Sequence, residues 1–172
     1  MVYFNNRLSR QFKNYSPLIK LIIINVVVFI FLFIVELFGI SSDYLNLPSS
    51  FRAFITQPWS IFTYMFVQHN FLHLLFNMLW LYWFGQIFML TLNEYQLLSL
   101  YILGGIIGGI LYLTINISTS NSMPILEGSS ASVLAIMIAT TLRSPDYKLN
   151  LFLFGEVKLK WFALICIFLI LI

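Results

Sequence analysis

The stretch HNFLHLLFNMLWLYWFGQIFML, residues 69–90, decides the fold. It is long and apolar enough to cross a bilayer, because a spanning helix needs roughly 20 residues for a hydrocarbon core about 30 Å thick. His69, His73 and Asn77 recur at intervals of four, which predicts one polar stripe along a helix. Polar side chains are costly in hydrocarbon, so this stripe is a candidate functional site.

Composition indicates that the whole chain is a membrane protein. Hydrophobic residues make up 60% of its 172 residues and charged residues only 9%, whereas about a quarter of a soluble domain is charged. Four further apolar segments predict spans at residues 18–40, 95–117 and 128–142 and from Val157 onward. The predicted fold class is an all-α polytopic membrane helix bundle of about five helices. It forms one domain over residues 1–172.

Basic residues predict the orientation of these helices. Eight of the nine Lys and Arg residues lie near the start of the first helix or between the fourth and fifth, and only Arg52 lies on the other side. The positive-inside rule then places the N-terminus in the cytoplasm. The loops 41–60 and 116–127 face outward, and the predicted location is the bacterial cytoplasmic (inner) membrane.

Several partners are not expected from this composition. The net charge of +3 is too small and too scattered to indicate nucleic acid. The single cysteine, Cys166, lies in an apolar run and predicts no disulfide. His69 and His73 could bind a metal ion together, but no carboxylate or thiol lies close in sequence to complete the site. We therefore predict no cofactor and no metal, and the lipid bilayer as the surrounding partner.

Small residues mark the third and fourth predicted helices. Four glycines of the third form overlapping small-x-x-x-small patterns, which predict close helix packing: Gly104, Gly105, Gly108 and Gly109. The fourth opens with GSSAS, residues 128–132. A serine there can be a packing residue and helix cap, or a nucleophile where free backbone N–H groups bind an oxyanion. The polar stripe at the same depth favours the nucleophile over simple hydrogen bonding between helices.

At these residues the chain resembles the rhomboid family of intramembrane serine proteases. His73 and Asn77 match the family's HxxxN signature in its second helix, and residues 128–131 (GSSA) resemble its GxSG or GxSA motif. The resemblance implies that Ser130 is the nucleophile and that His73 and Asn77 stabilise the oxyanion. It also implies that Gly128 permits close backbone approach. The implied substrates are transmembrane proteins, and the oligomeric state is not predicted.

The sequence departs from the family pattern in two places. Rhomboids usually carry a histidine five residues before position 73, where this chain has Gln68, followed by His69. The family's general base is a histidine of a sixth helix, and this sequence stops at Ile172 within the fifth. We therefore expect a fragment that is inactive as it stands. The alternative is a non-catalytic member of the superfamily that binds transmembrane clients.

Overall fold

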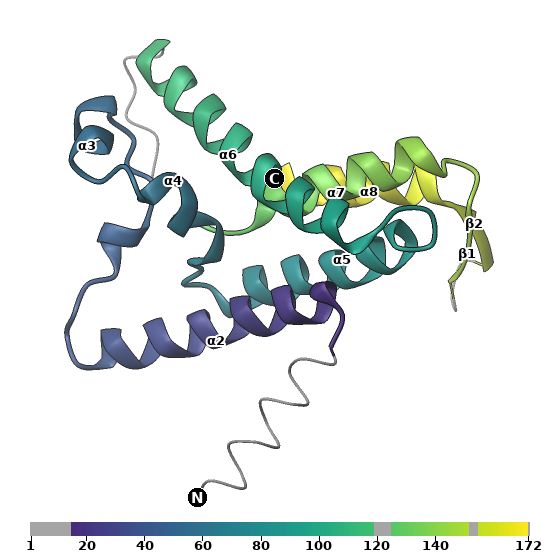
Figure 1. Ribbon diagram of the computed structural model, residues 1–172, viewed down its shortest axis with the longest axis horizontal. Coiled ribbons are helices and arrows are strands. Elements are labelled where there is room, and N and C mark those ends of the chain that lie inside the picture. Colours follow the sequence, from purple (N-terminus) through teal and green to yellow (C-terminus); the bar gives the residue numbers. More distant parts are fainter. Residues whose placement is uncertain (1–14, 119–124, 152–154, 172) are drawn as a thin grey trace, which may run out of the picture.

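The computed structural model describes residues 15–118, 125–151 and 155–171. Within them, five apolar helices form one bundle (Figure 1): α2 (Pro17–Leu37), α5 (Phe71–Phe88), α6 (Glu94–Ser118), α7 (Ser130–Arg143) and α8 (Leu159–Leu171). Of these described helices, α2, α5 and α6 are long and apolar enough to cross a membrane, and α7 and α8 are shorter apolar helices. The predicted all-α membrane bundle is confirmed. The basic residues Arg7, Arg10 and Lys13, on which the predicted orientation partly rests, lie outside the described residues.

Local sequence signals set the ends of α2 and α5. The Ser16 side chain caps α2 by accepting a hydrogen bond from the Ile19 amide, and Pro17 occupies the first turn, where its missing N–H costs nothing. Asn70 caps α5 by accepting from the amides of Leu72 and His73. Because Asn70 is the cap, α5 begins at Phe71, two residues later than the predicted start at residue 69.

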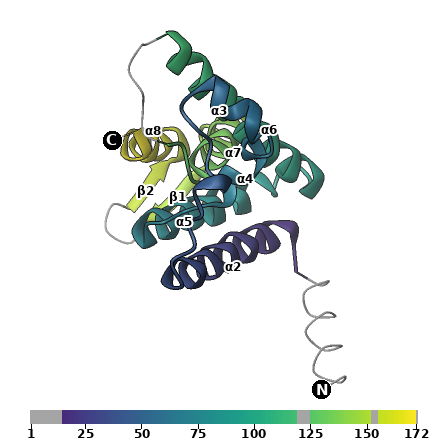
Figure 2. The same ribbon diagram turned by 90° about the vertical axis from the view of Figure 1, so that its left-hand side faces the viewer.

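Helix α2 lies along one side of the bundle, next to α5 (Figure 2). Leu18 fills the space over Gly85, where an added Cβ would lie 2.5 Å from its Cδ1 atom. Deeper in the bundle, the fully buried Asn25 donates from Nδ2 to the Tyr101 hydroxyl of α6 at 3.0 Å. A buried amide is stable there because it is hydrogen-bonded. This bond ties α2 to α6 within the apolar interior.

Helix α7 packs closely against α5 and α6. A Cβ added to Gly104 of α6 would lie 2.4 Å from the Cβ of Ala135, and one added to Gly108 would lie 2.5 Å from the Cβ of Ala131. Only glycine allows the two helices to approach this closely. The packing role predicted for the glycines of this helix is confirmed at these two positions.

The segment between α2 and α5 is folded rather than irregular. It contains η1 (Asp43–Leu45), α3 (Phe51–Thr56), α4 (Ser60–Thr63) and η2 (Tyr64–Phe66). Side chains of its second half hold the first half in place: Trp59 Nε1 donates to the Tyr44 carbonyl at 3.0 Å, and Thr63 Oγ1 donates to the Leu45 carbonyl at 2.7 Å. The segment therefore forms a compact unit at the end of the bundle where α5 and α7 begin, which we call the site end.

A hairpin of two antiparallel strands, β1 (Lys148–Leu151) and β2 (Gly155–Lys158), connects α7 to α8 at the opposite end. The sequence predicted a loop here, followed by a helix that begins near Val157. Val157 instead pairs with Leu149 in the hairpin, and α8 begins two residues later, at Leu159. Hydrogen bonds from the Lys158 and Lys160 ammonium groups hold the pKa of the Asp146 carboxyl below its usual range.

The contact between Gly104 and Ala135 predicts the effect of exchanging these two residues. Gly104→Ala places a methyl group against the Ala135 Cβ and should cost about 1–3 kcal/mol of unfolding free energy, the usual range for overpacking. The double variant with Ala135→Gly should recover most of that loss, because it vacates the same space. Thermal unfolding in detergent measures both. A double variant no more stable than Gly104→Ala would contradict the predicted contact.

Candidate functional site

Polar side chains from two stretches of the chain, residues 68–77 and 129–130, meet at the site end of the bundle. His73 and Asn77 lie on α5, one turn apart, and Ser130 is the first residue of α7. Gln68 precedes α5, and Ser129 precedes α7. Gln68, Asn77 and Ser129 are almost completely buried, whereas His73 and Ser130 are partly exposed.

The Ser130 hydroxyl lies between the two polar groups of α5. Its Oγ is 2.7 Å from His73 Nε2, and the imidazole donates or accepts there according to its tautomer. Asn77 Nδ2 donates to the same Oγ over a longer distance of 3.4 Å. The structure therefore brings the three residues together, as the sequence predicted. Their catalytic roles stay predictions.

A second layer of hydrogen bonds orients Asn77. Its Nδ2 donates to Gln68 Oε1 at 3.0 Å, and Gln68 Nε2 donates in turn to Ser129 Oγ at 3.4 Å. With both hydrogen bonds made, the Gln68 side chain is fixed by groups on either side. Such buried networks restrict side-chain rotation when each member has a partner. Asn77 is thereby held with its amide nitrogen toward Ser130.

Gly128 lies two residues before α7, in a conformation and a space that glycine fits better than any residue with a Cβ. Its φ is +97°, a conformation that side chains with a Cβ rarely adopt. A Cβ at this position would also lie 2.8 Å from His73 Cε1. The Gly128 amide donates to the Tyr64 carbonyl at 2.9 Å, which fixes the backbone beside the imidazole. The close backbone approach implied for Gly128 is therefore present, although its catalytic role stays a prediction.

The first backbone N–H groups of α7 can act as hydrogen-bond donors to a ligand. Ser129 occupies the N-cap position, but its side chain makes no capping hydrogen bond; its hydroxyl accepts a hydrogen bond from Gln68. The first amides of a helix have no partner within the helix, and their dipoles favour negative charge. Ser130 therefore presents its hydroxyl where backbone N–H groups can also bind an oxyanion.

His69 does not belong to the group of side chains around Ser130. The predicted stripe of His69, His73 and Asn77 is wrong for its first member, because His69 precedes the Asn70 cap and lies outside the helix. Its ring contacts acidic groups of other segments, and Gln68 takes the place beside Asn77. The sequence carried one signal for this difference: an asparagine at position 70 is a strong helix start.

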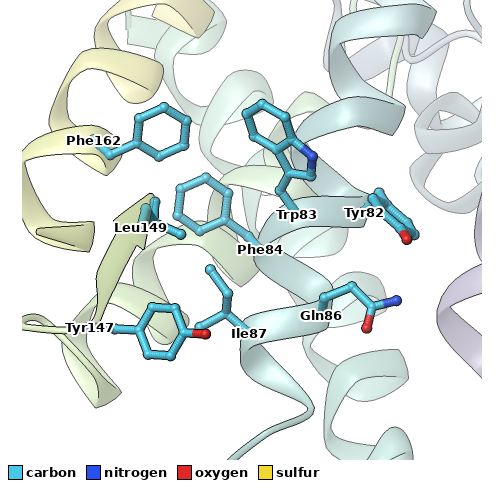
Figure 3. Close-up of a pocket in the computed structure, with 8 residues that line it drawn as sticks. All are labelled: Tyr82, Trp83, Phe84, Gln86, Ile87, Tyr147, Leu149 and Phe162. Atoms are coloured by element: carbon cyan, nitrogen blue, oxygen red, sulfur yellow. The ribbon is translucent and has the colours of Figure 1, made fainter. Parts of the chain in front are cut away.

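Two other features of the described residues do not add to the site. No cluster of three or more His, Cys, Asp and Glu side chains that could hold a metal ion occurs in this part of the chain. A hollow of about 380 Å³ lies near the hairpin and is mostly aromatic (Figure 3). Its lining consists of Tyr82, Trp83, Phe84, Gln86, Ile87, Tyr147, Leu149 and Phe162. None of the polar residues around Ser130 contributes to it.

Fold and site together define a polytopic membrane protein with a serine, an imidazole and an amide at one end of the bundle. The family model for the Rhomboid domain matches residues 56–172, which is more than half of the chain. The chain therefore belongs to the rhomboid family. No curated protein matches it significantly.

The geometry of Gly128 predicts that alanine is poorly tolerated there. Gly128→Ala combines an unfavourable backbone conformation with a clash against His73. Gly39→Ala is the matched control, because Gly39 also has a positive φ, of +76°, but an added Cβ there meets nothing within 4 Å. We expect Gly128→Ala to cost at least ~1 kcal/mol more than Gly39→Ala, as overpacking adds to the backbone cost. Equal thermal unfolding of the two variants would contradict the contact with His73.

Proposed function

We propose that the protein is an intramembrane serine endopeptidase that cleaves the transmembrane segments of other membrane proteins. The observation that carries the proposal is the 2.7 Å contact between Ser130 Oγ and His73 Nε2, with Asn77 beside it. A serine used only for packing does not need an imidazole and an amide directed at its hydroxyl. Membership of the rhomboid family supports the same chemistry.

In the proposed reaction, Ser130 Oγ attacks the carbonyl carbon of the scissile peptide bond. The carbonyl oxygen becomes an oxyanion, which accepts hydrogen bonds from His73, Asn77 and the Ser130 backbone N–H. Such donors act strongly in a water-poor site, because they are already oriented before charge develops. Collapse of the intermediate breaks the C–N bond, releases the amine and leaves an acyl-enzyme that water hydrolyses.

A general base must take the Ser130 proton and pass it to the leaving amine, since serine is a weak nucleophile by itself. The family resemblance assigns this role to a histidine of a sixth helix. The 172 residues contain two histidines, His69 and His73, and we assign His73 to the oxyanion. We therefore expect activity only in a protein in which such a base accompanies Ser130.

We further propose that the site end faces the outside of a bacterial cytoplasmic membrane. At the hairpin end, the described residues include Lys20 near the start of α2 and a basic cluster around the hairpin: Arg143, Lys148, Lys158 and Lys160. Arg52 is the one described Lys or Arg on the site-end segments. The positive-inside rule then puts the hairpin in the cytoplasm. A substrate helix would unwind locally at the outer leaflet, because its carbonyls are otherwise hydrogen-bonded.

Labelling with a fluorophosphonate tests the nucleophile and the orientation together. A charged, membrane-impermeant probe added to intact cells should label the full-length protein at Ser130, and Ser130→Ala should abolish labelling. Ser129→Ala is the matched control, because its hydroxyl bonds Gln68 rather than His73. Mass spectrometry of the labelled peptide identifies the modified residue.

Equal labelling of the Ser130→Ala variant would rule out Ser130 as the nucleophile. Labelling that occurs only in permeabilised cells would show that the site end faces the cytoplasm, opposite to the proposed orientation. A folded protein that no fluorophosphonate labels, permeant or not, would instead favour a non-catalytic role in binding transmembrane clients.

The oxyanion donors predict a graded series of kinetic effects. His73→Ala and Asn77→Ala should each lower kcat about 100-fold, or ~3 kcal/mol of transition-state stabilisation, while KM changes little. Gln68→Ala should lower kcat less, because Gln68 bonds Asn77 and not Ser130. Cleavage of a reconstituted transmembrane substrate measures all three. An Asn77→Ala variant with unchanged kcat would exclude Asn77 as a donor to the oxyanion.

A further inference from the structure

Three ionisable side chains meet at the site end without touching Ser130. Glu36 lies in the last turn of α2, His69 precedes α5, and Glu127 precedes Gly128. His69 Nε2 is 2.9 Å from Glu36 Oε1, and its Nδ1 is in close contact with Glu127 Oε2. The proposed reaction uses none of these groups. Their arrangement therefore needs a separate explanation.

The chemistry of the three groups suits a clamp. An ionised carboxylate only accepts hydrogen bonds, so an imidazole that carries protons on both nitrogens can donate to both partners at once. The His69 backbone amide donates to Glu127 Oε1 at 3.4 Å, which gives Glu127 two donors from one residue. On the other side, the Ser42 hydroxyl donates to Glu36 Oε1 at 2.5 Å and lies 2.8 Å from His69 Nε2.

The three side chains are partly exposed, and their contacts form one network instead of a single pair. The side chains of His69, Glu36 and Glu127 are only 30%, 38% and 28% exposed. Fully exposed ion pairs contribute little, whereas partly buried charges are screened less by salt. A network that joins three separate segments also restrains more of the chain than an isolated pair.

The clamp holds the segment Leu126–Gly128, which precedes α7. Leu126 pairs with Leu47 through two backbone hydrogen bonds of 3.0 Å, and the Gly128 amide bonds the Tyr64 carbonyl. Glu127, between these two residues, is held by His69. Three consecutive residues are therefore fixed from three directions, and Ser130 follows two residues after the last of them.

We propose that His69 is a positioning residue, which clamps the Leu126–Gly128 segment to the end of α2 and so sets Ser130 against His73. This effect on Ser130 rests on the proposed function. His69 acts on Ser130 only through Glu127 and the backbone that follows it. Glu36 anchors the clamp on α2. His69 thus contributes to the site without contacting the reacting atoms.

Hydrogen exchange tests the clamp independently of any activity. In the full-length protein in detergent, we expect the Leu126 and Gly128 amides to exchange about tenfold faster in His69→Gln and in Glu127→Gln, because local opening of the segment becomes easier. The double variant should exchange no faster than either single one, since both remove the same contact. Glu156→Gln is the matched control: it breaks the exposed ion pair with Lys148 at the hairpin and should leave these amides unchanged.

The rate of fluorophosphonate labelling then tests the link to Ser130. His69→Gln and Glu127→Gln should slow the inactivation step about tenfold with little change in probe binding, and Glu156→Gln should not. Unchanged amide exchange in His69→Gln, or additive effects in the double variant, would overturn the clamp. Faster exchange with unchanged labelling would overturn the positioning role. A wild-type protein that is not labelled would instead contradict the proposed function, while amide exchange would still decide whether the clamp exists.

Discussion

Close contact between α6 and α7 is the constraint on which the rest of the structure depends. Ser130 opens α7, and it reaches His73 only because α7 lies deep in the bundle, against α5 and α6. That depth requires Gly104 and Gly108 at the points where α6 meets the alanines of α7. In hydrocarbon there is little hydrophobic force between helices, so close van der Waals contact between small residues is a main source of association. The contact of Ser130 with His73 is therefore a consequence of backbone packing.

The helices and the shared face of His73 and Asn77 could be predicted from the sequence, because both follow from regular spacing. The meeting of Ser130 with them was expected from their shared depth in the bundle and from the resemblance to the rhomboid family. Apolar length predicts a span, and the i, i+4 interval puts two α5 side chains on one face. The role of Gln68 could not be predicted in this way. It lies outside the helix, where no periodicity relates it to Asn77, and its contact depends on how the preceding turn is folded.

The hairpin and the contacts of His69 escaped prediction for two different physical reasons. Strands of four residues are too short for their alternation to stand out from the apolar helix that follows, so the sequence alone predicts a helix that begins near Val157. The contacts of His69 join positions 36, 69 and 127, which are far apart in sequence. A pairing of that kind depends on the packing of whole helices. Only the cap residue Asn70, which marks the start of α5 at Phe71, is a local signal in the sequence.

The exposure of the polar groups explains how they divide into two sets. Glu36, His69 and Glu127, which can carry charge, stay about one third exposed, whereas Gln68, Asn77 and Ser129 are neutral and at most 2% exposed. Burying a charge costs far more than burying a hydrogen-bonded amide. Charged groups can therefore hold the segments together at the rim, and neutral donors can line the interior at modest cost. The Ser130 hydroxyl thus contacts an imidazole and an amide, while the carboxylates of Glu36 and Glu127 bond His69 instead.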